Sequence, residues 1–149
     1  MATNDPYQDY PMRGLIHHID LTVKDPDASF AFYDAVLGFL GYRCVDRHAR
    51  GFDWDLREPG APFCSIGIVR AEGDGARRPH DRHAPGQHHL AWTAASRADV
   101  DALHALLLTL GAEVLDAPAD YPRYGAGYYA VFFADPDGLK LEYVCWPAG

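Results

Sequence analysis

The sequence predicts an α+β fold made of two consecutive βαβββ modules, and two observations carry this prediction. Alternating apolar and polar residues, typical of a half-buried strand, recur in "GLIHHIDLTV" and in "GQHHLAWTA". A helical stripe of apolar residues follows each of these segments and ends at a glycine. The second stripe lies 70 positions after the first, which indicates an internal repeat: Phe30, Tyr33, Leu37, Leu40 and Gly41 against Val100, Leu103, Leu107, Leu110 and Gly111.

The first module is expected to begin with a strand over residues 16–23. Asp25-Pro26-Asp27 then predicts a helix start, because Asp can cap a helix, proline suits its first position and an acid suits its first turn. The helix is expected to end at Gly41. Three short strands are expected to complete the module, near residues 42–48, 52–57 and 63–69.

The second module repeats this order, beginning with the strand "HHLAWTA" (88–94). Ser96-Arg97-Ala98-Asp99 resembles a capping box, with Asp in place of the usual Glu or Gln, and Gly111 ends the predicted helix. Strands are expected near 112–115, 128–134 and 139–146. The turns "EPG" (58–60) and "DPDG" (135–138) precede the last strand of each module.

The chain is therefore divided into an N-terminal arm (1–13), a first module (14–70), a linker loop rich in Gly, Pro and charge (71–86), and a second module (87–149). A length of 149 residues suits one domain. The net charge of −8 and the dispersed basic residues argue against a nucleic-acid interface. No apolar run is long enough for a membrane helix. Three cysteines without a paired spacing and no signal-peptide pattern predict a cytoplasmic location.

Strand parity separates the two members of each histidine pair. His17 and His88 share the parity of the apolar residues, so a structural role is expected for them, whereas His18 and His89 share the parity of polar or small residues. Glu142, in "LKLEYV", also lies opposite the apolar positions of its strand. If the two modules curl into one concave sheet, His18, His89 and Glu142 converge. Two imidazoles and a carboxylate can bind a divalent metal and leave coordination positions open.

The chain resembles the vicinal oxygen chelate superfamily, which includes glyoxalase I, extradiol dioxygenases and methylmalonyl-CoA epimerase. The resemblance covers residues 14–146 and is carried by "HIDLTV" with "FYDAVLGFLGY", and by "HHLAW" with "YGAGYYAVFFADPDGLKLEYV". It implies a cup-shaped mixed sheet around a divalent metal, with His18, His89 and Glu142 as ligands. It also implies a small-molecule substrate with vicinal oxygens and a homodimer, with modules exchanged between chains in some members.

Glyoxalase I-like members carry a fourth ligand, a Glu, on the last strand of the first module, and the epimerases carry Gln there. The matching segment here, "APFCSIGIV" (61–69), has no acid, amide or histidine, and Ser65 or Cys64 is expected at the position that corresponds to Glu142. This departure favours a dioxygenase that uses Fe(II) or Mn(II). The alternative is a glyoxalase-like lyase or isomerase, similar to lactoylglutathione lyase, that uses Zn(II) or Ni(II).

Extradiol enzymes also transfer protons through a histidine and a tyrosine. The resemblance therefore implies His80 or His83, with His83 preferred, and Tyr128 or Tyr129 as catalytic candidates. The segment "RYGAGYY" (123–129) can form a flexible lid, because its glycines permit motion. A further alternative is a metal-free binding protein of the bleomycin-resistance type. The net charge of −8 suits a cationic ligand, but the intact ligand set argues against this alternative.

Overall fold

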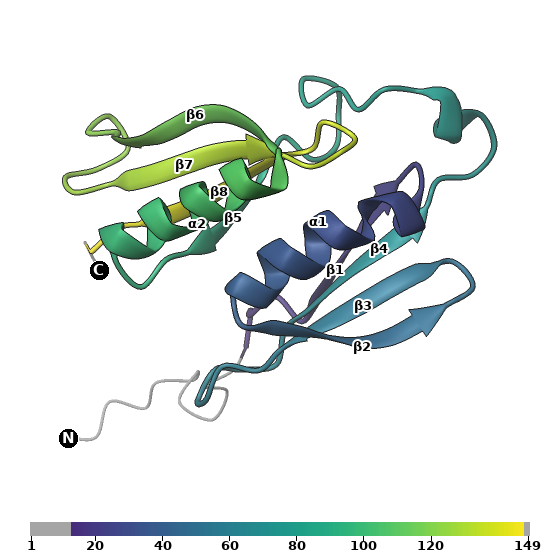
Figure 1. The fold of residues 1–149 in the computed structure, drawn as a ribbon, viewed down its shortest axis with the longest axis horizontal. Helices are drawn as coiled ribbons and strands as arrows, with labels where there is room; N and C mark the ends of the chain where they lie inside the picture. Colours follow the sequence, from purple (N-terminus) through teal and green to yellow (C-terminus); the bar gives the residue numbers. More distant parts are fainter. Residues whose placement is uncertain (1–12, 148–149) are drawn as a thin grey trace, which may run out of the picture.

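The computed structural model describes residues 13–147, so residues 1–12 of the predicted N-terminal arm lie outside the described residues. The first module contains β1 (His18–Val23), α1 (Pro26–Phe39), β2 (Tyr42–His48), β3 (Gly51–Leu56) and β4 (Ser65–Arg70). The second contains β5 (Leu90–Thr93), α2 (Arg97–Leu110), β6 (Glu113–Asp120), β7 (Tyr129–Ala134) and β8 (Lys140–Cys145), and a short 3-10 helix, η1 (Gly73–Arg77), lies in the linker. The predicted α+β fold is confirmed (Figure 1). No helix within residues 13–147 is long and apolar enough to span a membrane.

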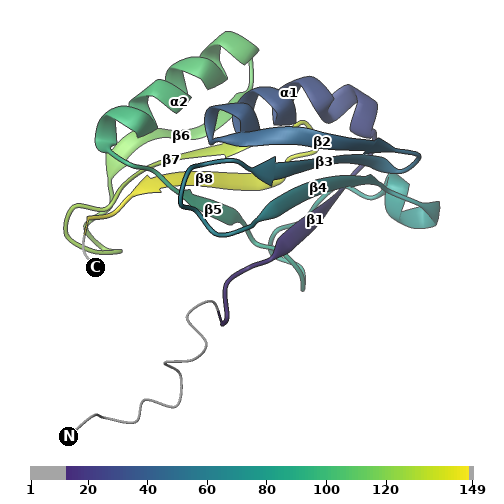
Figure 2. The same ribbon diagram turned by 90° about the horizontal axis from the view of Figure 1, so that it is seen from below.

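Each module forms its own four-stranded mixed sheet, with the order β1-β4-β3-β2 in the first and β5-β8-β7-β6 in the second. The first and last strands of each module pair in parallel, and the other neighbours are antiparallel. Both helices lie on the same side of the pair of sheets (Figure 2). The opposite side of each sheet is called its helix-free face below.

The helix ends agree with the predicted signals. Asp25 caps α1, and Ser96 caps α2 by accepting a hydrogen bond from the backbone of Asp99. The Asp99 carboxylate accepts the backbone N–H of Ala95 at 3.2 Å, so the capping box closes one residue earlier than its usual form. Gly111 ends α2 with a φ of 65°, a conformation that glycine adopts without steric cost.

Strand ends differ from the predictions in both modules. β1 begins at His18 and β5 at Leu90, two residues later than expected, because the parallel partner strands begin only at Ser65 and Lys140. β6 extends to Asp120, five residues farther than predicted. Its pairing with β7 contains two register shifts, which interrupt the alternation of apolar residues that sequence patterns depend on.

A continuous hydrophobic core fills the space between the sheets and the two helices. Trp54 on β3 and Phe133 on β7 are both fully buried in it. Helix α1 also reaches the second module, because the ring of Phe32 lies 6.3 Å from that of Phe133. The hydroxyl of Tyr33 donates a 2.6 Å hydrogen bond to the buried carboxylate of Asp135. The two modules are therefore joined through α1.

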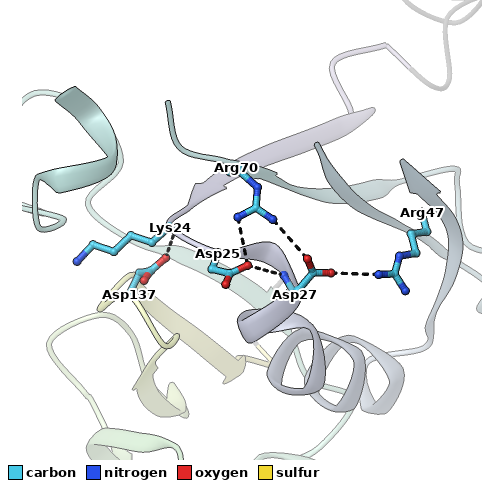
Figure 3. A network of polar contacts seen from close by, with 6 residues as sticks. All are labelled: Lys24, Asp25, Asp27, Arg47, Arg70 and Asp137. Carbon is cyan, nitrogen blue, oxygen red and sulfur yellow. Dashed lines mark hydrogen bonds and ion pairs between the residues drawn. The ribbon is translucent and has the colours of Figure 1, made fainter. Parts of the chain in front are cut away.

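A polar network at the start of α1 adds a second link between the modules (Figure 3). The backbone N–H of Lys24 donates to the Asp137 carboxylate at 2.6 Å, so the "DPDG" turn of the second module holds the end of β1. Arg70 reaches Asp25 and Asp27 at 3.3 and 3.4 Å. These ion pairs are exposed and contribute little free energy, whereas the bond to Asp137 fixes the relative position of two segments far apart in sequence.

Candidate metal centre

Glu142 lies at the centre of the helix-free face of the second sheet. It pairs with Ala91 on β5 and with Phe132 on β7, while its sequence neighbours Leu141 and Tyr143 face the helices. Its side chain is only 2% exposed. A carboxylate at this depth costs free energy unless charged or polar partners compensate it, so its contacts define the site.

Each carboxylate oxygen of Glu142 has one such partner. His89 Nε2 lies 3.2 Å from Oε2, and the hydroxyl of Tyr128 donates a short hydrogen bond to Oε1. Burial, and then the hydrogen bond to Glu142, raise the pKa of Tyr128 well above its usual value. Tyr128 therefore stays protonated at neutral pH and acts as a hydrogen-bond donor to the carboxylate.

The histidine pairs form the same contact in both modules. His88 and His89 share a hydrogen bond between their Nδ1 atoms at 2.8 Å, and His17 and His18 do so at 3.0 Å. His17 and His88 were expected to face the core, but both are exposed, because the strands begin after them. Their contacts occupy Nδ1 of the second histidine and leave its Nε2 available, as ligand-orienting partners do.

His83 extends this arrangement into the linker. Its ring lies 5.7 Å from that of His88, so the imidazoles of His83, His88 and His89 follow one another towards Glu142. Loss of hydration, followed by the proximity of His89, lowers the pKa of His88. A neutral His88 can accept a hydrogen bond from Nδ1–H of His89, which leaves the lone pair of His89 Nε2 free to bind a metal ion beside the carboxylate.

The structure brings His89 and Glu142 together but does not bring His18 to them. His18 is exposed on the helix-free face of the first sheet, where Asp20 and Thr22 follow it on the same side of β1. Within residues 13–147, no group of three His, Cys, Asp or Glu side chains is close enough to hold a metal ion. One chain thus presents two separate parts of the predicted ligand set.

The His89–Glu142 pair fits one half of a metal centre. Two donors bound to one ion at about 2.1 Å and roughly a right angle lie about 3 Å apart. The separation of 3.2 Å between His89 Nε2 and Glu142 Oε2 agrees with this value. An imidazole nitrogen and a carboxylate oxygen are also a donor combination that divalent transition metals accept.

The other catalytic candidates occupy different places. The Tyr129 hydroxyl donates to Asp101 on α2 at 2.6 Å, and Arg97 lies 3.9 Å from its ring centre, so Tyr129 faces the helices and not Glu142. His80 lines a separate cavity of about 190 Å³ between β1 and the linker. Of the four candidates, Tyr128 contacts Glu142 directly, and His83 is linked to His89 through the ring of His88.

Aromatic side chains that sequence patterns did not single out surround Tyr128. The ring centres of Tyr124 and Trp146 lie 5.2 and 6.0 Å from that of Tyr128, and Tyr121 stacks on Tyr124. A Cβ at Gly125 would lie 2.7 Å from the Trp146 indole nitrogen, so the segment predicted as a lid packs closely against this ring. The cluster forms an apolar wall beside Glu142.

The pairing register corrects the predicted counterpart of Glu142 in the first module. Ile19 pairs with Ile66 as Leu90 pairs with Leu141, which makes Gly67, one residue after Ile66, the counterpart of Glu142. The expectation of Ser65 or Cys64 was wrong. The loop between β3 and β4 has eight residues and that between β7 and β8 has five, so distance from the preceding turn does not identify the matching residues of β4 and β8.

A cavity between the two modules lies away from this pair. It measures about 430 Å³ and is lined by residues of α1, the α2–β6 junction and the turn after β7, including Phe32, Leu110 and Asp135. None of the three predicted metal ligands lines it. This cavity is therefore not part of the predicted metal site.

Comparison with known proteins identifies a family for this chain. Residues 15–143 match the model of the Glyoxalase/Bleomycin resistance protein/Dioxygenase superfamily. The chain is 34% identical to the uncharacterised protein YqjT of Bacillus subtilis (strain 168), over 87% of this chain and 97% of the relative. It is 32% identical to a 2-epi-5-epi-valiolone epimerase of an Actinomyces species, over 90% and 80%. The crystal structure of a proposed glyoxalase from Bacillus halodurans superposes with a TM-score of 0.74 and 31% identity, over 90% and 97%.

Proposed function

Because the chain belongs to the Glyoxalase/Bleomycin resistance protein/Dioxygenase superfamily, we propose that it is a metal-dependent enzyme acting on a small substrate with vicinal oxygens. The observation that carries this proposal is the contact between His89 Nε2 and the buried Glu142 carboxylate at 3.2 Å, with Tyr128 bound to the other oxygen. His89 and Glu142 are two ligands of the ion and His18 is the third.

His18 reaches the ion from a second copy of the chain. His18 and Glu142 both lie on helix-free faces, and a partner chain can bring one such face against the other. Leu15, Ile16 and Phe63, near His18 at the edge of the first sheet, are 53%, 59% and 50% exposed, an apolar surface that suits an interface. A two-fold homodimer then contains two identical sites, each with His18 from one chain and His89 and Glu142 from the other.

The proposed reaction is proton transfer at a carbon next to a coordinated oxygen, the chemistry of an epimerase or isomerase. A divalent ion supplies Lewis-acid polarisation of the substrate oxygens. His83, at the outer end of the imidazole series, accepts and returns the proton, while Tyr128 holds Glu142 in place. The aromatic wall of Tyr124, Tyr128 and Trp146 excludes water from one side. The named activity of the Actinomyces relative supports this reaction class.

Dioxygenase chemistry is the second candidate. Two histidines and one carboxylate leave three positions of a six-coordinate ion free, which suits Fe(II) or Mn(II) with a bidentate substrate and O2. Zn(II) or Ni(II) at the same ligands supports proton transfer alone. Anaerobically Fe(II)-loaded protein should consume oxygen with catechols if the second candidate holds. Exchange of solvent deuterium into α-hydroxyketones, without oxygen uptake, would support the proton-transfer reaction.

Metal binding tests the ligand set directly. His89→Ala, Glu142→Gln and His18→Ala should each lower the metal content of purified, reconstituted protein from one ion per chain towards zero. His104→Ala on α2 is the matched control and should retain native content, because α2 covers the other side of the sheet. Full metal content in folded Glu142→Gln protein would refute the proposed site.

Mixing variants tests whether the site is shared between chains. When His18→Ala and Glu142→Gln chains are unfolded and refolded together, half of the dimers contain one chain of each. Each mixed dimer regains one intact site, so metal content should return to about a quarter of the native value. If all ligands came from one chain, mixing would restore no site and the metal content would stay near zero.

A further inference from the structure

We propose that Asp20 supplies the carboxylate that the first module contributes to the metal centre, in the space left free by Gly67. The inference rests on the proposed metal-dependent function and goes beyond it, because it assigns a fourth side-chain ligand. Asp20 lies on β1, two positions after His18 and on the same face of the sheet.

The two modules place their acids differently along one cross-strand row of the helix-free face. In the second module Glu142 stands on the inner strand β8, between two uncharged neighbours. In the first module the inner strand β4 carries Gly67, between two aspartates. The paired rows are Ala91–Glu142–Phe132 and Asp20–Gly67–Asp53. The acid is therefore on the inner strand β8 in the second module, whereas in the first module the acids are on β1 and β3, the two strands beside β4.

The missing side chain of Gly67 leaves a space that these carboxylates fill. A Cβ built on Gly67 would lie 2.6 Å from Asp53 Oδ1 and even closer to Asp20 Oδ1. No side chain fits there without displacing both oxygens. The carboxylate of Asp20 therefore occupies the space that corresponds to the Glu142 side chain in the second module.

Asp20 is better placed than Asp53 to serve as the ligand. The Asp53 carboxylate already has a basic partner, since His48 Nε2 lies 3.4 Å from its Oδ2. Asp53 is also on β3, two strands away from His18, whereas Asp20 and His18 lie on one strand with their side chains on one face. In the second module the corresponding pair comes from different segments, because His89 directly precedes β5 and Glu142 lies on the adjacent strand β8.

A fourth ligand changes what the centre can accept. With four protein donors, a six-coordinate ion keeps two positions, which the two vicinal oxygens of a substrate fill. This arrangement favours the proton-transfer reaction over the dioxygenase alternative, because it leaves no position for O2 beside a bidentate substrate. Asp20 is therefore a residue that decides between the two reaction classes.

Metal affinity and spectroscopy of full-length variants test this assignment. Metal-stripped protein is titrated with Mn(II), with the free ion followed by electron paramagnetic resonance, and the Co(II) absorption spectrum reports the ligand set. Asp20→Asn should weaken Mn(II) binding by about 10- to 100-fold and alter the Co(II) spectrum. Asp53→Asn and Asp55→Asn, the matched controls on β3, should stay within about threefold of native affinity, because they remove the same charge without removing a ligand.

A triple variant tests whether a carboxylate on the inner strand can replace Asp20. Asp20→Ala with Gly67→Glu and Asp53→Phe copies the Ala91–Glu142–Phe132 row into the first module and should bind Mn(II) more tightly than Asp20→Asn. Native affinity and an unchanged Co(II) spectrum in Asp20→Asn would overturn the proposal, as would a larger loss in Asp53→Asn. If His18→Ala or Glu142→Gln still loses the metal in that case, the three-ligand function stands and only the assignment of Asp20 fails.

Discussion

The two modules agree closely on the side that faces the helices and differ on the helix-free side. On the helix side, Trp54 in the first module corresponds to Phe133 in the second, and Ile66 to Leu141, so large apolar residues stand at matching positions. On the helix-free side the second module buries Glu142, which accepts a hydrogen bond from Tyr128, while the first module exposes His18 and Asp20.

This difference shows which constraints act on each side of a duplicated sheet. Core positions accept only exchanges that preserve apolar volume, because cavities and overpacking both cost stability. On the helix-free faces the two modules carry residues of different chemistry at matching positions, with Glu142 against Gly67 and Phe132 against Asp53. Functional differences between the modules are therefore expected on these faces, and stability differences in the shared core.

The largest effect is expected from removing a shared core side chain. Trp54→Ala should lower the free energy of unfolding by about 3–5 kcal/mol, because the indole is fully buried among aromatic rings. Since the core is continuous through α1, both modules should still unfold in one transition. Urea unfolding followed by circular dichroism and by the fluorescence of the two remaining tryptophans, Trp92 and Trp146 of the second module, measures this. A fluorescence transition at unchanged urea concentration would show that the modules are independent, and Trp146→Ala is the exposed control.

A smaller effect is expected from the buried link between the modules. Tyr33→Phe should cost about 1–2 kcal/mol, because it removes a hydrogen bond to the buried Asp135 carboxylate. Burial raises the pKa of Asp135 and the Tyr33 bond lowers it, so the variant's Asp135 pKa should rise further. A carboxyl with a raised pKa destabilises the fold as pH increases through that pKa.

The loss in Tyr33→Phe should therefore be greater at neutral pH than at acidic pH, where Asp135 binds a proton. Thermal unfolding at both pH values measures it. Tyr124→Phe is the control, because its hydroxyl is bound only by the exposed Arg123 among the described contacts. An equal loss at the two pH values would contradict the charge-based explanation.

Tyr128→Phe probes the helix-free face of the second module, where the expected change is in metal affinity. Loss of the hydrogen bond to Glu142 should weaken metal binding about tenfold, because partners that orient a ligand contribute on this scale. The first module has Ala49 at the corresponding position, so it offers no such partner. Tyr129→Phe removes a hydroxyl on the helix side and should leave metal affinity unchanged. Equal losses in the two variants would argue against a specific role for Tyr128.

The smallest effect is expected at the exposed pair of Arg97 and Asp120. Hydrogen bonds from Arg97 lower the pKa of Asp120, so this carboxylate stabilises the fold above its unfolded pKa and loses that contribution as pH falls. Asp120→Asn should therefore reduce the decline in melting temperature between neutral and acidic pH. The change should be smaller than that of Tyr33→Phe, because solvent screens the exposed pair. A larger change would show that the pair is coupled to the core through Tyr129.

Local chemistry made much of the fold predictable. The cap residues Asp25 and Ser96 and the terminator Gly111 act through their own backbone neighbours, so both helices were predicted within two residues of their ends. The predictions of where β1 and β5 begin were less accurate, because these starts depend on pairing with β4 and β8. The same long-range pairing determines that Gly67 corresponds to Glu142, and composition or periodicity carries no information about it.

The candidate site was predictable only in part. Parity placed His89 and Glu142 on one face, and the structure brings them into contact. The same parity included Asp20, but its relation to Gly67 depends on how three strands are aligned. The sequence alone did not distinguish Tyr128 from Tyr129 as a catalytic candidate, because the two are adjacent residues of the same type. Only the sheet geometry separates the one that contacts Glu142 from the one that faces α2.

The hydrogen bond between Tyr33 and Asp135 also has a consequence for biosynthesis. The two residues are separated by 102 positions, so α1 leaves the ribosome long before its partner turn is made. At typical translation rates this delay lasts about 5–20 s. During that time the side of α1 that carries Phe32 and Tyr33 has no second module to cover it. The nascent chain therefore presents an aromatic surface that a ribosome-associated chaperone can shield until the "DPDG" turn emerges.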